Sequence, residues 1–384
     1  MASAQITHLE AAVAHGLQEV GRLQALNDDL RMRLMALYLA WRALGEVHAH
    51  LATCSGTGGD GGGGGNDNSS SSSTSDCRSA AALRAQLALE DCLAKAVRGS
   101  GSGSNDGGGS CPRDSAALAE EAARLVAPLL DHLPHLAPGC CILHIEGATA
   151  EEVESYSTMD LPALLAIWRG LVMKARGAIA RADALDAQAC PVPAARRAEA
   201  HAAIRDVGIQ MKRLHHLLML HAFPLYMRWG VAHLETGESV MGDADAPLSH
   251  LEAVARAARG TRIQVRLALS MHSSFRARLA AVHAERGAIS DELAAASELT
   301  TAPGGAAELP LMADELAISL EENTRAESAM QSAHSHSVIA LSTPVQLARQ
   351  VCVAYPYPLS GPKYFAVLSH MLKFEPAAFA ERAE

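Results

Sequence analysis

Residues that could bind a metal ion are densest between residues 131 and 144. Imidazole nitrogens and thiolates are ligands that Zn²⁺ prefers. The spacing here matches no zinc-binding pattern, and two adjacent cysteines are poorly placed around one tetrahedral ion. The residues are Asp131, His132, His135, Cys140, Cys141 and His144, in a connector with two prolines and a glycine. We therefore predict no metal site and no cofactor.

Two further groups of histidines could do chemistry. His215, His216 and His221 lie on a segment that also holds four leucines. A histidine among leucines is more often a hydrogen-bonded core residue than a ligand, so we expect these three to be structural. His334 and His336 stand in a serine-rich stretch, which we interpret as a solvated linker.

The recognised catalytic signatures do not occur in the sequence. The glycine runs are not followed by Lys-Ser or Lys-Thr at the start of a helix, so no phosphate-binding loop is predicted. There is no Gly-x-Ser-x-Gly turn, no His-Glu-x-x-His helix and no paired Cys/His signature. We predict no catalytic residues and a non-enzymatic protein.

The elements that must position these side chains are predicted from composition. The 384 residues are 49% hydrophobic but only 4% aromatic, so the core must consist mainly of Leu, Ala, Val and Met. Alanine has the best intrinsic helix propensity, and leucine loses little side-chain freedom in a helix. The chain is therefore predicted to be all-α.

Charge and hydropathy limit the partners. The net charge of −10 disfavours unaided nucleic-acid binding, which depends on Lys and Arg neutralising phosphates. The eight cysteines, apart from Cys140–Cys141, are too scattered to suggest a disulfide framework. Acidic residues from Glu10 onward interrupt any signal peptide, and no apolar run is long enough to cross a membrane. We expect a reducing compartment, nucleus or cytoplasm, and no membrane partner.

Low-complexity sequence divides the chain into three parts. Residues 54–113 contain two Gly/Ser-rich tracts, which bury too little apolar area to fold and are predicted to be disordered linkers. One short helix is expected between them, over residues 80–98. Residues 1–53 are predicted to form a coiled coil, and residues 114–384 a multi-helix domain.

Several helix boundaries in the C-terminal part carry a local signal. Asp160 before Leu161–Pro162 and Thr343 before Pro344 each offer a capping side chain with a proline in the first turn. Further helices are expected over 194–221 and 262–286 by apolar spacing. Residues 140–145 are the only plausible strand, and one strand cannot make a sheet.

A heptad repeat occupies residues 6–51. Counting sevens from Leu9 places leucine at six of seven d positions, with Gly16 as the exception. The a positions include three β-branched residues and Asn27, a combination that favours parallel two-stranded coiled coils and fixes their register. The predicted dimerisation residues are Ile6, Leu9, Val13, Val20, Leu23, Asn27, Leu30, Leu34 and Leu37. The partner is predicted to be a second copy or another zipper protein.

This repeat resembles the zipper half of a bZIP transcription factor, on the strength of Leu23, Leu26–Asn27, Leu30 and Leu34. The resemblance covers residues 6–51 and implies dimerisation, a role in transcription and a nuclear location. In that family an Arg- and Lys-rich helix precedes the zipper and reads DNA. Only Met1 to Gln5 precede it here, so the sequence either starts too late or belongs to a zipper protein that does not read DNA itself.

Two alternatives stay open. The same leucine spacing is typical of a core helix packed inside its own domain. Leu17 and Leu26 widen the stripe and Gly16 leaves a hole in it, whereas the Gly/Ser linker favours an intermolecular partner. At the level of function, the first hypothesis is a dimerising interaction protein. The second is a helical ligand-binding or enzymatic domain, which a cavity lined by polar groups within residues 114–384 would favour.

Overall fold

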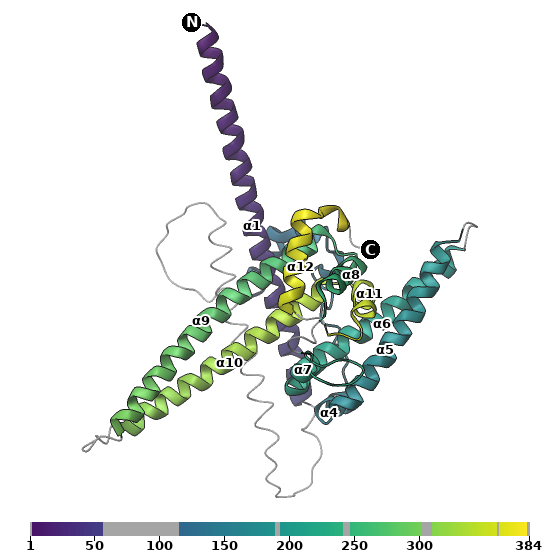
Figure 1. Cartoon of the computed structure of the whole chain (residues 1–384), viewed down its shortest axis with the longest axis vertical. Coiled ribbons are helices and arrows are strands. Elements are labelled where there is room, and N and C mark those ends of the chain that lie inside the picture. The colour runs from purple at the N-terminus through teal and green to yellow at the C-terminus, as the bar shows by residue number, and fades with distance from the viewer. Residues whose placement is uncertain are drawn as a thin grey trace, which may run out of the picture.

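The computed structural model describes residues 2–56, 115–188, 193–240, 246–300, 309–358 and 361–381, and there the regular elements are helices (Figure 1). The long helices are α1 (Ala2–Gly56), α5 (Leu161–Asp186), α6 (Ala194–His221), α9 (Arg262–Thr300) and α10 (Leu309–Leu341). The shorter helices are α3 (Ser115–Leu130), α4 (Ala150–Ser157), α7 (Phe223–Trp229), α8 (Leu248–Ala258), α11 (Pro344–Ala354) and α12 (Gly361–Phe374), with 3₁₀ turns at Pro134–Leu136 and Pro376–Ala378. The predicted all-α fold is confirmed. The helix predicted over residues 80–98 lies outside the described residues.

Local capping explains where two of the helices begin. The Asp160 carboxylate accepts a hydrogen bond from the Ala163 amide at 2.9 Å and starts α5. Thr343 and Gln346 form a reciprocal capping box at the start of α11. Both starts were predicted from the sequence, as were the two ends of α6.

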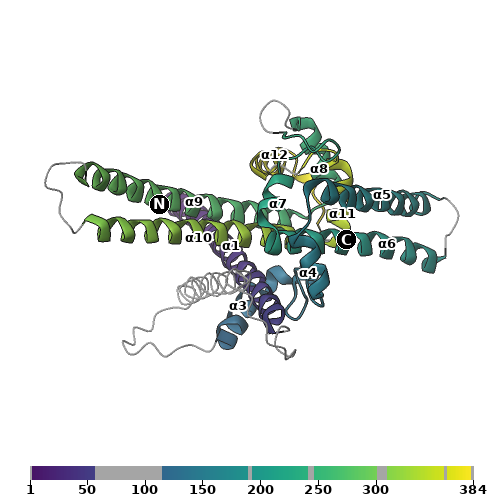
Figure 2. The ribbon, with the colours of Figure 1, turned by 90° about the horizontal axis from the view of Figure 1, so that it is seen from below.

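Helix α9 continues beyond its predicted end at residue 286, because α10 supports it. The two helices lie side by side in both views (Figures 1 and 2). Arg286 donates to Asn323 of α10 at 3.0 Å and also pairs with Glu327. Gly287 follows without a break in the helix. Tertiary pairing thus outweighs the weak helix propensity of glycine.

Residues 140–145 form a loop rather than the predicted strand. The Glu46 carboxylate of α1 accepts hydrogen bonds from the amides of Ile142 at 2.9 Å and Leu143 at 3.0 Å. The Cys141 thiol lies 3.3 Å from the same carboxylate. A side chain therefore satisfies backbone groups that a neighbouring strand would otherwise pair with. The one segment that the sequence offered as a plausible strand is therefore a loop.

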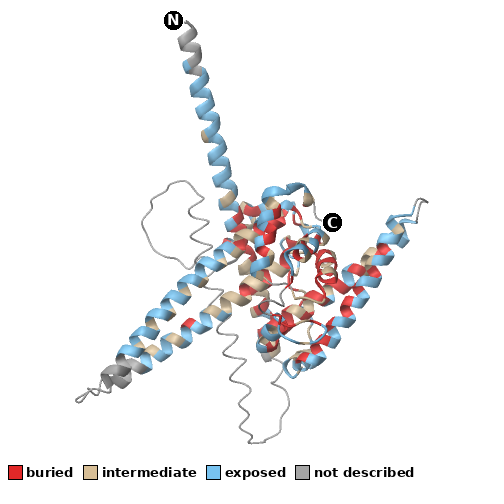
Figure 3. Cartoon of the chain, in the orientation of Figure 1, coloured by how far each residue is buried: buried red, intermediate tan, exposed pale blue. Residues whose placement is uncertain are grey.

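Helix α1 has two unlike halves. Its outer turns project from the body and are exposed, whereas its inner turns are buried (Figure 3). The inner half packs against α3, α9 and α10. The packing boundary lies near Met32, inside the segment predicted to be a zipper.

Two apolar cores hold the body together. The first joins the inner half of α1 to α3, α9, α10 and α12. The second joins α5, α6, α7 and α11. In the second core α6 and α11 approach closely at Gly208, where a Cβ atom would lie 2.0 Å from the Pro344 carbonyl oxygen. Glycine is therefore required at this helix crossing.

Candidate functional site

The outer half of α1 carries a stripe of exposed apolar side chains. Their exposed fractions run from 47 to 68%. They are Val13, Leu17, Val20, Leu23, Leu26 and Leu30. Burying a Val or Leu side chain is worth roughly 1.5–3 kcal/mol, so this stripe holds a large unused driving force for association. Scattered exposed leucines are normal on a protein surface, but a contiguous helical stripe is a candidate interaction site.

The predicted dimerisation residues divide between the two halves of α1. Four predicted apolar residues, Val13, Val20, Leu23 and Leu30, are exposed on the outer half, and so is Asn27. Leu34 is buried and Leu37 is half-buried, both within the first core of the body. The side chains of Ile6 and Leu9 lie outside the described part of α1.

The charges beside the stripe are compatible with a second copy of the same helix. Arg22 pairs with Glu19 at 2.6 Å and Arg33 with Asp29 at 2.9 Å, within the helix itself. In a parallel dimer each g residue faces the e residue five positions later on the partner. These facing pairs are Ala12 with Leu17, Glu19 with Gln24, and Leu26 with Arg31. None of them places like charges together.

The inner half of α1 is closed to any partner of this kind. Met35 and Leu39 are fully buried although they lie outside the a and d positions. Arg42 donates to the carbonyl oxygens of Leu136 and Cys140, and Glu46 holds the loop that follows. The body thus covers the inner half on several sides.

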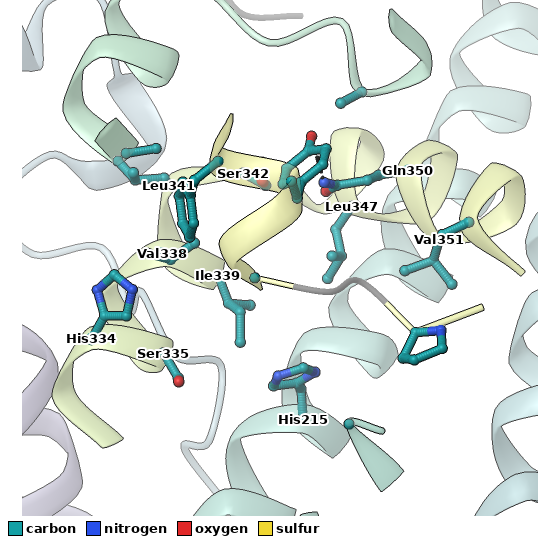
Figure 4. Close-up of a pocket in the computed structure, with 18 of the residues that line it drawn as sticks. His215, His334, Ser335, Val338, Ile339, Leu341, Ser342, Leu347, Gln350 and Val351 are labelled. Atoms are coloured by element: carbon teal, nitrogen blue, oxygen red, sulfur yellow. Dashed lines mark hydrogen bonds between the residues drawn. The ribbon is translucent and has the colours of Figure 1, made fainter. Parts of the chain in front are cut away.

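A cavity of about 600 Å³ forms a second candidate site, between α7, α9, α10 and α11 (Figure 4). Its walls are rich in aromatic rings. The whole chain has five Phe, six Tyr and three Trp, fourteen in all, and nine of them line this cavity. They are Trp168, Phe223, Tyr226, Trp229, Phe275, Tyr357, Tyr364, Phe365 and Phe379. In so aromatic-poor a chain this concentration singles out the cavity.

The polar groups of the cavity wall are uncharged. The lining contains no Lys, Arg, Asp or Glu. His215 Nε2 lies 3.0 Å from the Tyr226 hydroxyl, and Gln350 donates to the Tyr364 hydroxyl at 2.8 Å. Desolvation lowers the pKa of His215 to about 3 and that of His334 to about 4. Both rings are therefore neutral at pH 7, and the wall carries no net charge.

The histidines of α10 are structural rather than solvated. His336 is fully buried and its Nδ1 lies 2.7 Å from Nδ1 of His216, which is also buried. Burial lowers the pKa of both rings. The ring of His334 stacks on Phe275 with centroids 4.3 Å apart. The solvated-linker prediction for His334 and His336 was wrong, because α10 runs through this serine-rich stretch to Leu341. His216, by contrast, is the hydrogen-bonded core residue that was predicted.

The potential metal ligands between residues 131 and 144 do not point towards a common centre. His135 lies 2.9 Å from the Leu341 carbonyl oxygen, and Cys141 lies against Glu46. Across the described residues no group of three or more His, Cys, Asp or Glu is placed to hold a metal ion.

Lys212 is the charged residue that sequence reasoning missed. It is fully buried in α6, and its Nζ donates to the Ala340 carbonyl oxygen at 3.3 Å. Burial lowers its pKa to about 7. The only signal in the sequence is its position among apolar residues of a long helix.

Comparison of the chain with known protein families, with curated proteins and with solved structures gives no match in any of the three. Of the helices within the described ranges, none has both the length and the apolar character needed to cross a membrane.

Proposed function

We propose that this chain is a dimerising interaction protein, and that residues 10–30 of α1 pair with the same segment of a second copy in a parallel coiled coil. The observation that carries the proposal is the exposed apolar stripe on a helix that leaves the body (Figure 3). The net charge of −10 supports a protein partner rather than a nucleic acid. A role in transcription rests on the resemblance to bZIP zippers.

Asn27 supports the parallel orientation. In a parallel pair it faces its mate, and the two amides can hydrogen-bond to each other across the seam. In an antiparallel pair of residues 10–30 the two Asn27 side chains would lie far apart along the seam, each beside apolar residues of the partner, and two buried amides would be left unpaired. Such a group costs about 1–3 kcal/mol. The paired segment ends near Leu30, because the body covers the stripe from Leu34 onward.

The test is the oligomeric state of the full chain by sedimentation equilibrium. About three heptads bury a modest area, so we expect dimers at about 100 µM and dissociation well below that. Leu23→Glu should abolish the dimer, since it places two carboxylates at facing d positions. Ala25→Glu makes the same change on the exposed opposite side of the helix and should leave the dimer intact.

Two outcomes would contradict the proposal. A wild-type chain that is monomeric at about 100 µM would remove self-pairing, and binding to another zipper protein would then become the alternative. A dimer that survives Leu23→Glu would place the interface elsewhere.

A cysteine pair tests the orientation of the helices. Under mild oxidation Val13→Cys should give a new disulfide-linked dimer only if the helices are parallel. Ala11→Cys, on the outer side of the same turn, serves as the control.

A further inference from the structure

We propose that the aromatic cavity between α7, α9, α10 and α11 is a binding site for a neutral, flat, mostly apolar small molecule that carries a hydrogen-bond donor. This inference is independent of the dimer. A volume of about 600 Å³ falls within the range of small-molecule sites, which are typically mainly apolar with a few well-placed polar groups.

The absence of charged side chains from the lining determines the charge of the ligand. A charged ligand would lose its hydration on entering and would meet no counter-charge on the wall. His215 and His334, the two lining residues that could become cationic, are held neutral at pH 7 by desolvation. A neutral molecule pays no such penalty.

The aromatic rings determine the shape of the ligand. Trp168 and Trp229 meet edge to face with centroids 4.8 Å apart, and Trp229 also lies at 5.1 Å from His215 in the same arrangement. On the other wall Phe275 and His334 stack in parallel. These mutual contacts hold the rings in place before any ligand arrives. Flat rings set in fixed planes favour a flat aromatic partner.

Gln350 supplies the polar contact. Its side chain is nearly fully buried, and its amide nitrogen donates a hydrogen bond to the Tyr364 hydroxyl (Figure 4). Among the described residues, the hydrogen bond of the Gln350 side chain is the one from its nitrogen to Tyr364, and its amide oxygen accepts none. The hydroxyls of Ser335 and Ser342 lie on the same lining. The Gln350 carboxamide oxygen can therefore accept a hydrogen bond from an N–H or O–H group of the ligand.

The cavity reaches solvent beside α7. Met227 and Val231 both line it, and both are exposed although they are large apolar residues. A ligand can therefore enter on this side without unfolding of either core.

The experiment uses two matched dyes and the full chain. N-phenyl-1-naphthylamine is neutral, consists of two flat aromatic ring systems and carries one N–H group, and its 8-sulfonate derivative adds one anionic sulfonate group. Titrated by fluorescence, the neutral dye should bind saturably, with one site per chain. The sulfonate should bind at least about tenfold more weakly. Equal binding of the two dyes would overturn the neutral-ligand inference.

Variants decide whether the dye sits in the cavity. Ser335→Phe fills the cavity from α10 and should weaken binding of the neutral dye by about tenfold or more. Ser328→Phe makes the same change on an exposed position of the same helix and should have no effect. If Ser335→Phe fails to fold by circular dichroism, Val338→Trp, one turn along, takes its place. Unchanged affinity in a folded filling variant would overturn the proposal.

The apolar stripe of α1 could also attract a dye. Leu23→Glu should therefore bind the neutral dye as the wild type does. Loss of binding in that variant would assign the dye to the stripe and contradict the cavity site, whatever the oligomeric state of the chain.

Discussion

The two halves of α1 share one heptad stripe but use it differently. In the outer half, residues 10–30, the stripe is exposed, whereas in the inner half, residues 32–51, the body covers it. The rest of the helix circumference differs as well. Outside the stripe the inner half has Met32, Met35 and Leu39, and the outer half has charged residues, Gln, His, Ala and Gly. A helix that is apolar all round belongs in a core, and a helix with a single stripe needs one partner surface.

The comparison shows what a leucine repeat leaves undecided. The spacing predicts that a helix will be covered along one side, and it does not say whether the cover comes from the same chain. The width of the apolar surface is the better guide. By that measure the residue types change near Met32, where the body begins to cover the helix.

The largest expected effect is in the inner half. Leu39 is fully buried, so Leu39→Ala removes buried area and leaves a cavity, at a cost of about 2–5 kcal/mol in the free energy of unfolding. Leu23→Ala in the outer half should change it by less than about 0.5 kcal/mol. Urea denaturation, at a concentration where the chain is monomeric, measures both. Equal losses would mean that the outer half also packs within the chain.

The next effect concerns Lys212, whose buried amine is influenced by Glu46 of the inner half. Its pKa falls from 10.5 to about 7 in the folded chain, so the unfolded chain binds more protons between these two values. Burial of Lys212 therefore lowers the free energy of unfolding by its full amount below pH 7. This loss shrinks as the pH rises and vanishes above 10.5. Lys212→Met should stabilise the chain at pH 7 by on the order of 4 kcal/mol and flatten this slope.

Denaturation series from pH 6 to 10 check this expectation, with the exposed Lys174→Met as the matched control. A stabilisation that does not depend on pH would mean that Lys212 keeps its charge in the folded chain and forms an ion pair there. Glu46 of the inner half of α1 would then act as the counter-ion of Lys212, in addition to the apolar contacts that this half makes.

Sequence reasoning succeeded where the cause is local. The Asp160 and Thr343 caps bind amides within three residues of themselves, so the starts of α5 and α11 could be predicted. Composition alone was enough for the all-α class. The end of α9 and the loop at 140–145 could not be predicted, because both depend on partners far away in the sequence, Glu327 and Glu46.

The exposed stripe of α1 and the aromatic cavity also depend on contacts between distant parts of the chain, which limits what the sequence predicts. The heptad positions of the outer stripe follow from spacing, but its exposure depends on where α3, α9 and α10 end their contact with α1. The cavity had no signal in the sequence, since its walls come from helices spread between residues 168 and 379. The serine-rich segment around His336 was misjudged for a related reason. Ser337 donates to the Ala333 carbonyl oxygen inside α10 and so loses its polar character towards solvent.

The smallest expected effect tests the seam of the outer half. Asn27 is exposed in the single chain, so Asn27→Val should leave the free energy of unfolding of the monomer nearly unchanged. In the dimer it exchanges a polar pair for apolar burial at facing a positions, which should tighten association by about tenfold and raise the melting temperature. The stoichiometry should loosen at the same time, because a valine pair accepts other registers and a third helix, whereas an amide pair is satisfied in one. Sedimentation equilibrium and thermal melts across a concentration series measure both changes. Gln18→Val, an exposed position on the opposite side of the same helix, is the control and should alter neither. Weaker association with unchanged stoichiometry would mean that Asn27 does not face its mate, and the outer half would then have to find its partner in another orientation.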